Sequence, residues 1–328
     1  MSVYKRGFDL YLDGNISEAT QALLPYKANY GAIPVIDDRG VLTSWGCELL
    51  CAEYKLDKVF NTSLASVVAN SIEGVAPEIR TQFQRCGLID TEHKVTRNGY
   101  YKLIESLPLN EQVARLGIFH EELAFPKEDK KKVENYVVDY FEQRAFRCFA
   151  DEGQIFSLLI SLSLINELDR LNKYSKFDLK HPPATCGVNL RTFWNDFASF
   201  PFCATDDRKI AILEIIGQTT KERICSGIEM LQRAGSRQLR YYDVNAILEF
   251  FESLGLDRLL KITSFLLDNP DCDTGWPDIT AFKYGEVVLI EVKQNDKLRF
   301  SQARTISELV SKLGAILPKV QVCKVRLT

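Results

Sequence analysis

Residues 275–302 read GWPDITAFKYGEVVLIEVKQNDKLRFSQ. Two runs rich in β-branched and aromatic residues, ITAF and EVVLIEVK, flank a short turn at residues 283–285, which is the pattern of a β-hairpin. Downstream, FSQARTISELVSKLG (300–314) predicts a helix closed by its final glycine, and VQVCKVRL (320–327) predicts a further strand. The order strand, turn, strand, helix, strand indicates an α/β layer.

Two carboxylates and one ammonium mark this hairpin. Asp278 begins the first strand and Glu291 lies thirteen positions later in the second, so pairing brings them to one end of a sheet. Side chains alternate along a strand, so Lys293 shares a face with Glu291 while Val292 points to the other face. Carboxylates suit Mg²⁺ or Mn²⁺, which lowers the pKa of bound water, and Lys293 could orient that water and balance charge on a phosphoryl transition state. A bare Glu-x-Lys would favour two solvent-facing residues, because such tripeptides are common.

The longer pattern is more specific. It consists of Gly275, Pro277, Asp278, Glu291, Val292, Lys293, Asn295, Asp296, Leu298 and Gln302. This arrangement resembles the VRR-NUC branch of the PD-(D/E)XK nucleases. That family usually has E-V-K-G-P-N-D where this chain has EVKQND, so the turn after Lys293 must differ.

The resemblance extends upstream to the Fanconi-associated nuclease family, in which an acidic residue and a glycine precede an apolar helix. Here Asp151, Glu152 and Gly153 precede QIFSLLISLSLINELD. The likeness implies four ligands for Mg²⁺ or Mn²⁺: the carboxylates of Glu152, Asp278 and Glu291 and the backbone carbonyl of Val292. Glu152 could instead be an ordinary carboxylate at a helix start.

The same likeness assigns further roles. Lys293 would be the catalytic lysine, acting with Asp278 and Glu291, and Gln302 would steady the site or touch the substrate backbone. The neighbouring acids are expected to be turn or cap residues and not ligands; they are Asp271, Asp273 and Asp296.

The expected fold class is α/β, with mainly helical N-terminal and connecting regions and a C-terminal restriction-endonuclease-like mixed sheet flanked by helices. We expect a helical domain at 1–118 and a nuclease domain with a helical insertion at 119–328, whose catalytic sheet spans 272–328. Residues 77–108 predict a helix, a short hairpin-like piece and a second helix, as in a winged-helix module or a plain helical domain. In a winged helix, the phosphate-facing charges would be Lys94, Arg97 and Lys102.

Composition limits the function classes. With 46% hydrophobic and 26% charged residues over 328 positions, the chain is typical of a folded protein and not of a disordered one. The longest apolar run, Ile155–Ile165, contains three serines and is shorter than the roughly 20 residues of a bilayer helix. Asp9 and Asp13 argue against a secretory signal. We therefore expect no membrane span and an intracellular protein, cytoplasmic in a bacterium or nuclear in a eukaryote.

Cysteine usage and charge refine this picture. The nine cysteines include no CxxC pair and the chain has three histidines, which favours reduced thiols over a structural zinc site. The net charge of −3 argues weakly against a nucleic-acid partner. Residues 272–328, however, contain nine Lys or Arg against six Asp or Glu, a local charge of +3. DNA binding that is sensitive to salt and confined to one face is therefore expected.

The sequence thus favours a metal-dependent, structure-specific DNA nuclease. By likeness to the family, the substrate would be branched DNA such as a 5′ flap, cleaved by a flap endonuclease or 5′–3′ exonuclease activity in DNA repair. Two alternatives remain open at this point. One is a Holliday-junction resolvase or a restriction or defence endonuclease, and the other is a DNA-binding module with an idle nuclease fold.

Overall fold

A computed structural model of the chain describes residues 4–26, 35–36, 40, 42–53, 77–90, 92, 94–167, 206–233, 238–269, 272, 274–316 and 318–328. The chain forms two compact units. The first comprises Met1–Leu116 with Lys297–Thr305, and the second comprises Gly117–Asp296 with Ile306–Thr328. The short segment 297–305 is therefore grouped with the N-terminal residues. The expected domain division between residues 118 and 119 stays a prediction.

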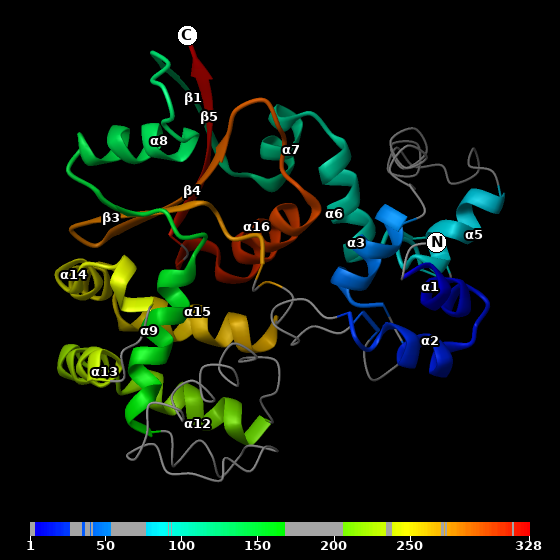
Figure 1. The fold of residues 1–328 in the computed structure, drawn as a ribbon, viewed down its shortest axis with the longest axis horizontal. Coiled ribbons are helices and arrows are strands. Elements are labelled where there is room, and N and C mark those ends of the chain that lie inside the picture. The colour runs from blue at the N-terminus through cyan, green and yellow to red at the C-terminus, as the bar shows by residue number, and fades with distance from the viewer. Residues whose placement is uncertain are drawn as a thin grey trace. The chain divides into compact units, whose positions relative to one another are not determined.

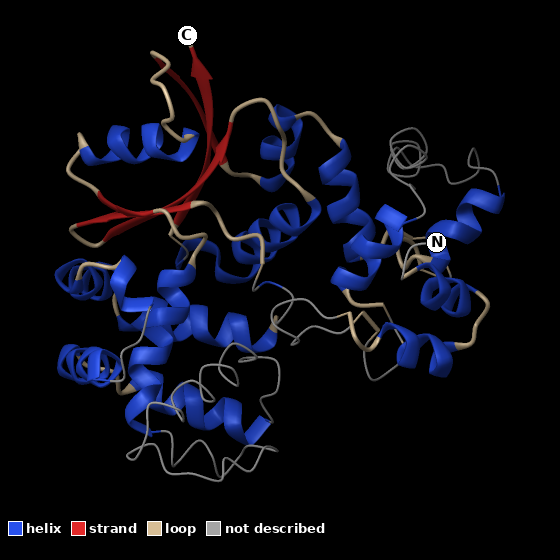
Figure 2. Ribbon diagram, viewed as in Figure 1, coloured by secondary structure: helices blue, strands red, loops and turns tan. Residues whose placement is uncertain are grey.

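A five-stranded mixed sheet forms the centre of the second unit, with strand order β1-β5-β4-β3-β2 (Figure 2). β1 (Phe119–Phe125) and β4 (Glu286–Lys293) both pair in parallel with β5 (Lys319–Leu327). β3 (Ile279–Lys283) pairs antiparallel with β4 and with β2 (Arg147–Phe149). The predicted α/β class and the mixed sheet are confirmed.

β3 and β4 form the hairpin that the sequence predicts. Their register pairs Ile279 with Ile290 at one end and Lys283 with Glu286 at the turn. The two turn residues, Tyr284 and Gly285, have φ angles of 44° and 81°. Positive φ at both central positions is the geometry of the tight turn that matches the right-handed twist of paired strands.

Helices cover both faces of the sheet (Figure 1). α8 (Val133–Glu142) packs on one face, where Val137 and Phe141 join a core with Ile279, Ala281, Val288, Ile290, Val292, Cys323 and Val325. α14 (Val244–Leu254) contacts β3 and β4 from the other side. On that side the ring of Phe250 lies 5.7 Å from Phe149 and 5.2 Å from Phe282.

A helical insertion lies between β2 and β3. In the part of it that the structure describes, the α-helices are α9 (Gln154–Leu164), α12 (Asp206–Gly217), α13 (Lys221–Arg233), α14 and α15 (Leu256–Asp268). The short 3₁₀ turns are η3 (Ile165–Glu167) and η4 (Gln238–Tyr241). α9 contacts the other four helices, which explains why almost its whole surface is buried and apolar. Among the described helices, none is long and apolar enough to cross a membrane.

The first unit is helical. Its described helices are α1 (Lys5–Leu12), α2 (Ile16–Leu23), α3 (Ser44–Glu53), α5 (Pro77–Arg85), α6 (Arg97–Ser106) and α7 (Leu109–Leu116). α5 and α6 are joined through an antiparallel bridge between Ile89 and Val95, which is the local helix, hairpin, helix order expected from the sequence. α16 (Phe300–Leu313) begins in this unit, and its last turn is followed by the 3₁₀ turn η6 (Gly314–Ile316).

The structure contradicts the expectation that Lys102 faces a phosphate backbone. Its side chain is buried in α6 and forms a 2.6 Å ion pair with Glu105, so it is not a phosphate-facing charge. Lys94 and Arg97 are exposed, and Lys94 pairs with Glu92 at 2.7 Å. Two strands, β1 and β2, were not predicted from the sequence.

Candidate active site

Asp278 and Glu291 lie side by side at one end of the hairpin. The register of β3 and β4 continues by one step from the Ile279–Ile290 pair to these two residues, so both side chains leave the sheet on the same face. Glu291 is fully buried and Asp278 is partly buried. The juxtaposition predicted from the hairpin is therefore present in the structure.

The pKa of Glu291 is raised to about 8, chiefly by burial and then by the neighbouring Asp278 carboxyl, against the opposing effect of Lys293. Burial also raises the pKa of Asp278, although its bond to the Val292 amide lowers it. Because the Asp278 carboxyl disfavours ionisation of Glu291, the two adjacent groups resist being ionised together. A bound cation would relieve that repulsion.

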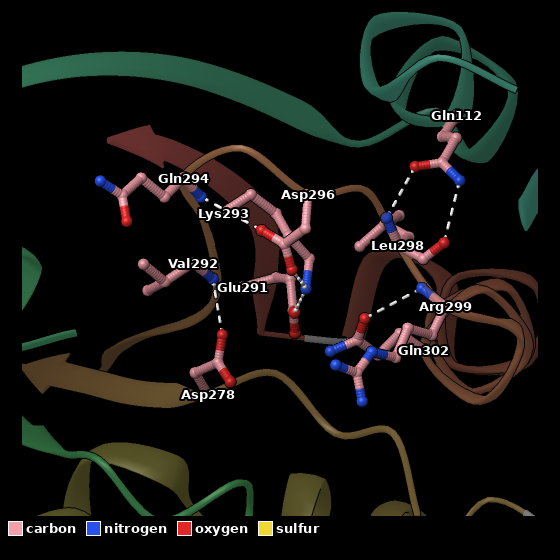
Figure 3. A network of polar contacts seen from close by, with 10 residues as sticks. All are labelled: Gln112, Asp278, Glu291, Val292, Lys293, Gln294, Asp296, Leu298, Arg299 and Gln302. Carbon is pink, nitrogen blue, oxygen red and sulfur yellow. Dashed lines mark hydrogen bonds and ion pairs between the residues drawn. The ribbon is translucent and has the colours of Figure 1, made fainter. Parts of the chain in front are cut away.

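Lys293 is held between two carboxylates (Figure 3). Its Nζ lies 2.8 Å from Glu291 Oε1 and 3.4 Å from Asp296 Oδ2, and only 4% of the residue is exposed. Burial by itself lowers the pKa of Lys293, but Glu291, Asp296 and Asp278 outweigh it and raise that pKa. The ammonium therefore stays protonated and suits charge stabilisation better than proton abstraction.

The turn after Lys293 is organised by Asp296. Its Oδ1 accepts a hydrogen bond from the Gln294 amide at 3.3 Å. Asp296 thus acts as a turn residue, as expected, and it steadies the lysine in a turn that lacks the Gly-Pro of the family pattern. Asp271 and Asp273 lie outside the described residues.

Val292 faces away from the carboxylates, as the strand alternation predicts. Its side chain packs in the core under α8, and its amide N–H donates to Asp278 Oδ2 at 2.7 Å. This bond fixes one oxygen of Asp278 against β4. The metal-binding role of the Val292 carbonyl stays a prediction.

Glu152 approaches the pair through its backbone. Its N–H donates to the carbonyl oxygen of Asp278 at 3.3 Å, while its side chain is exposed. Glu152 and Glu134, the latter in the first turn of α8, both raise the pKa of Asp278 by repulsion. Two acidic side chains besides Glu291 thus lie near enough to act on Asp278.

The donor chemistry fits a divalent cation in part. Asp278 and Glu291 offer adjacent carboxylates in a poorly hydrated position, which Mg²⁺ or Mn²⁺ would stabilise. Across the residues that the structure describes, however, no three His, Cys, Asp or Glu side chains form a metal-binding cluster. Glu152, which is exposed, does not complete such a cluster.

Gln302 lies in the first turn of α16. Its Oε1 accepts a hydrogen bond from the Arg299 amide at 3.0 Å, which satisfies a donor at the helix start (Figure 3). This bond gives Gln302 a role in ordering segment 297–305. The predicted role beside the substrate is a separate matter and stays a prediction.

Several basic residues of 272–328 are neutralised within the protein. Lys324 and Arg326 of β5 both pair with Glu122 of β1, at 3.3 and 2.5 Å, and Lys312 pairs with Glu308 at 2.9 Å. The local charge of +3 is therefore a poorer guide to a DNA-binding face than the sequence indicated. Lys297 and Arg299 are exposed.

Two residues that organise the Glu152 turn, Asp151 and Tyr242, were given no role in the sequence analysis. Asp151 accepts hydrogen bonds from the amides of Gly153 and Ile155 and from the hydroxyl of Tyr242. An aspartate ahead of an apolar helix is a recognisable capping signal, so Asp151 could have been found. Tyr242 lies 91 positions away, and no local pattern marks it.

Comparison with known proteins identifies the architecture. No protein-family model matches the chain, and no relative is found among curated proteins. Among solved structures, the chain is similar to a crystal structure of paFAN1 bound to 5′ flap DNA with a two-nucleotide flap and a gap, at a TM-score of 0.53 and 15% identity. The fold is FAN1-like.

A second paFAN1 structure, bound to DNA with a one-nucleotide 5′ flap and a gap, gives a TM-score of 0.50 at 15% identity. Each comparison covers 99% of this chain but 54% of the paFAN1 chain. This chain therefore spans about half the length of the FAN1 structures it matches. At this identity the likeness establishes the fold, and the site must be argued from its own residues.

Proposed function

We propose that this chain is a metal-dependent DNA nuclease that hydrolyses phosphodiester bonds in branched DNA, with a 5′ flap as the favoured substrate and repair as the favoured process. The observation that carries the proposal is the Asp278–Glu291 pair at a strand end, in which Asp278 is partly buried, Glu291 is fully buried and Lys293 forms an ion pair with Glu291. Burial of three ionisable groups is costly, and a catalytic role accounts for it. The paFAN1 structures bound to flap DNA support the choice of substrate.

Asp278 and Glu291 would hold Mg²⁺ or Mn²⁺, joined by the Val292 carbonyl and by Glu152 once its side chain turns inward. When bound, the ion supplies a water of lowered pKa and a counter-charge for the phosphate. The ammonium of Lys293 would orient that water and stabilise the negative charge that develops on the phosphoryl oxygens. Water oxygen adds to phosphorus, the bond to the leaving strand breaks, and one phosphate end and one hydroxyl end result.

The fixed geometry around Lys293 supports this role. Asp296 restrains the ammonium from one side and Glu291 from the other, so the lysine loses little conformational entropy when substrate binds. The Val292 amide restrains Asp278 in the same way. The residues are thus held in place before any substrate arrives.

The test is a panel of end-labelled 5′ flaps, forks, four-way junctions and single strands, incubated with Mg²⁺, Mn²⁺ or EDTA. We expect metal-dependent cleavage near the flap, and a loss of at least about 100-fold in Lys293→Ala. Cleavage by Lys293→Ala at the wild-type rate would contradict the assignment.

Two other outcomes of this panel would favour a different function. Symmetric nicking of the four-way junction by a dimer would favour a resolvase. Tight DNA binding that is indifferent to metal, with no cleavage of any structure, would favour a non-catalytic binding module.

A further inference from the structure

The turn between β2 and α9 holds Glu152 in an unusual backbone conformation. Glu152 has φ of 52° and Gly153 has φ of 77°, so two consecutive residues lie in the left-handed region. Glutamate pays a steric penalty there of about 1 kcal/mol or more that glycine avoids. Such strain persists only where the surrounding structure imposes it.

The side chain of Asp151 stabilises this strained conformation through hydrogen bonds within the turn. Its Oδ1 accepts from the Gly153 amide at 3.1 Å, and its Oδ2 accepts from the Ile155 amide at 2.8 Å. The carboxylate of the residue before the strained position therefore fixes the backbone that follows it. The same contacts cap α9, whose N-cap residue Gly153 supplies no side chain for that purpose.

Tyr242 anchors Asp151 to a distant part of the chain. Its hydroxyl donates to Asp151 Oδ2 at 2.7 Å, and its ring contacts Phe149 of β2 edge-on at 5.5 Å. Tyr242 directly precedes Asp243, the N-cap residue of α14, and α14 packs against β3 and β4. The anchor is therefore tied to the sheet that carries the catalytic residues.

The outer side of the turn meets the Asp278 segment. The Glu152 amide donates to the Asp278 carbonyl at 3.3 Å, and Gly153 lies against the indole of Trp276. The backbone of Glu152 is thus placed beside Asp278, while its side chain is free of the core and exposed.

We propose that Tyr242 and Asp151 are positioning residues, which hold the backbone of Glu152 beside Asp278 so that its carboxylate can join Asp278 and Glu291 on a divalent cation. This inference rests on the proposed function. It assigns a task to a tyrosine that touches neither the metal nor the DNA. It also explains why the strain in this turn falls on Glu152 itself.

The test is the affinity of the purified full chain for Mn²⁺ alone, measured by calorimetry and by the electron paramagnetic resonance signal of free Mn²⁺. Tyr242→Phe removes only the hydroxyl, and we expect it to bind Mn²⁺ about tenfold more weakly. Tyr241→Phe is the matched control, because the adjacent Tyr241 is 86% exposed and loses the same atom. That control should bind Mn²⁺ like the wild type.

A double-mutant cycle separates positioning from general stability. In a Glu152→Gln background, which lacks the ligand to be positioned, Tyr242→Phe should cause no further loss of Mn²⁺ affinity. A merely structural tyrosine would weaken binding equally in both backgrounds. Urea denaturation of each variant measures any change in folding, and raised Mn²⁺ should restore cleavage by Tyr242→Phe.

Each remaining outcome has a definite meaning. The inference would be overturned, with the proposed function left standing, if Tyr242→Phe bound Mn²⁺ as tightly as the wild type. The same holds if Tyr242→Phe lowered Mn²⁺ affinity as much in the Glu152→Gln background as in the wild type. Unchanged affinity in Glu152→Gln would do the same, because Glu152 would then not be a ligand. Failure of the wild type to bind Mn²⁺ would overturn both the inference and the proposed function.

Discussion

Gly153 rests on the indole ring of Trp276. A Cβ added to Gly153 would lie 2.8 Å from atoms Cγ and Cδ2 of that ring. Trp276 is itself fixed, because its Nε1 donates to the Cys272 carbonyl at 2.7 Å and its ring lies 5.0 Å from that of Phe156 in α9. This contact joins the turn that carries Glu152 to the segment that carries Asp278.

Gly153→Ala should therefore be strongly destabilising. Alanine would meet both the Trp276 ring and the steric cost of a φ of 77°. We expect a loss of about 2–4 kcal/mol in the free energy of unfolding, measured by urea denaturation. Gly285→Ala is the matched control, because Gly285 has φ of 81° and nothing within 4 Å of a Cβ. If the two variants lose the same free energy, the Trp276 contact contributes nothing.

The stability of the metal-free protein should fall as pH rises from about 5 to 8. Burial raises the pKa of Glu291 from 4.5 to about 8, so over this range the folded state binds a proton that the unfolded state has released. Asp278, whose pKa is also raised by burial, contributes in the same direction. Urea denaturation in EDTA across this range measures the slope.

Glu291→Gln should flatten that slope, because glutamine does not titrate. Glu286→Gln, at the exposed far end of the same strand, should retain it. A slope that is the same in Glu291→Gln and wild type would show that Glu291 is not the group responsible.

Gln112 should be a strong contributor to the stability of the first unit. It is fully buried, and its amide donates to the Ile104 carbonyl at 2.8 Å. The same amide donates to the Leu298 carbonyl at 3.0 Å and accepts from the Leu298 amide at 2.8 Å (Figure 3). Gln112→Leu keeps the volume but leaves these backbone groups without partners, so we expect a loss of about 2–3 kcal/mol.

The matched control for Gln112 is Gln143→Leu, at the exposed end of α8. Urea or thermal denaturation should show a change within about 0.5 kcal/mol for that control. A similar small change in Gln112→Leu would mean that segment 297–305 is not held by this side chain.

The C-terminal layer could be predicted because its signals are local. The turn at Tyr284 and Gly285, the β-branched run EVVLIEVK and the closing glycine of the last helix are all encoded by neighbouring residues. The hairpin register then brings Asp278 to Glu291 without further information. These are features that strand periodicity and turn chemistry determine on their own.

Strands β1 and β2 could not be predicted in the same way. β2 has three residues, and β1 reads FHEELAF at the sheet edge with charged residues along it. Edge strands are short and polar, so their periodicity is weak. Their place in the sheet follows from pairing with β3 and β5, which are far away in the chain.

Burial and long-range pairing decide which charges face solvent, and neither can be seen in a sequence window. Lys102 looks like a surface lysine in sequence, yet the packing of its helix buries it, where it pairs with Glu105 three positions along the chain. Lys324 and Arg326 were counted toward a basic face, yet both pair with Glu122 on a neighbouring strand. Net charge over a window does not reveal which charges are already paired.

The central claim is that Glu291 takes part in metal-dependent cleavage of DNA. The most direct measurement compares Glu291→Gln with Glu286→Gln, the same change at opposite ends of β4, in single-turnover cleavage of an end-labelled 5′ flap with Mn²⁺. We predict wild-type cleavage by Glu286→Gln and a loss of at least about 100-fold in Glu291→Gln, with both variants folded. Wild-type cleavage by Glu291→Gln would contradict the claim.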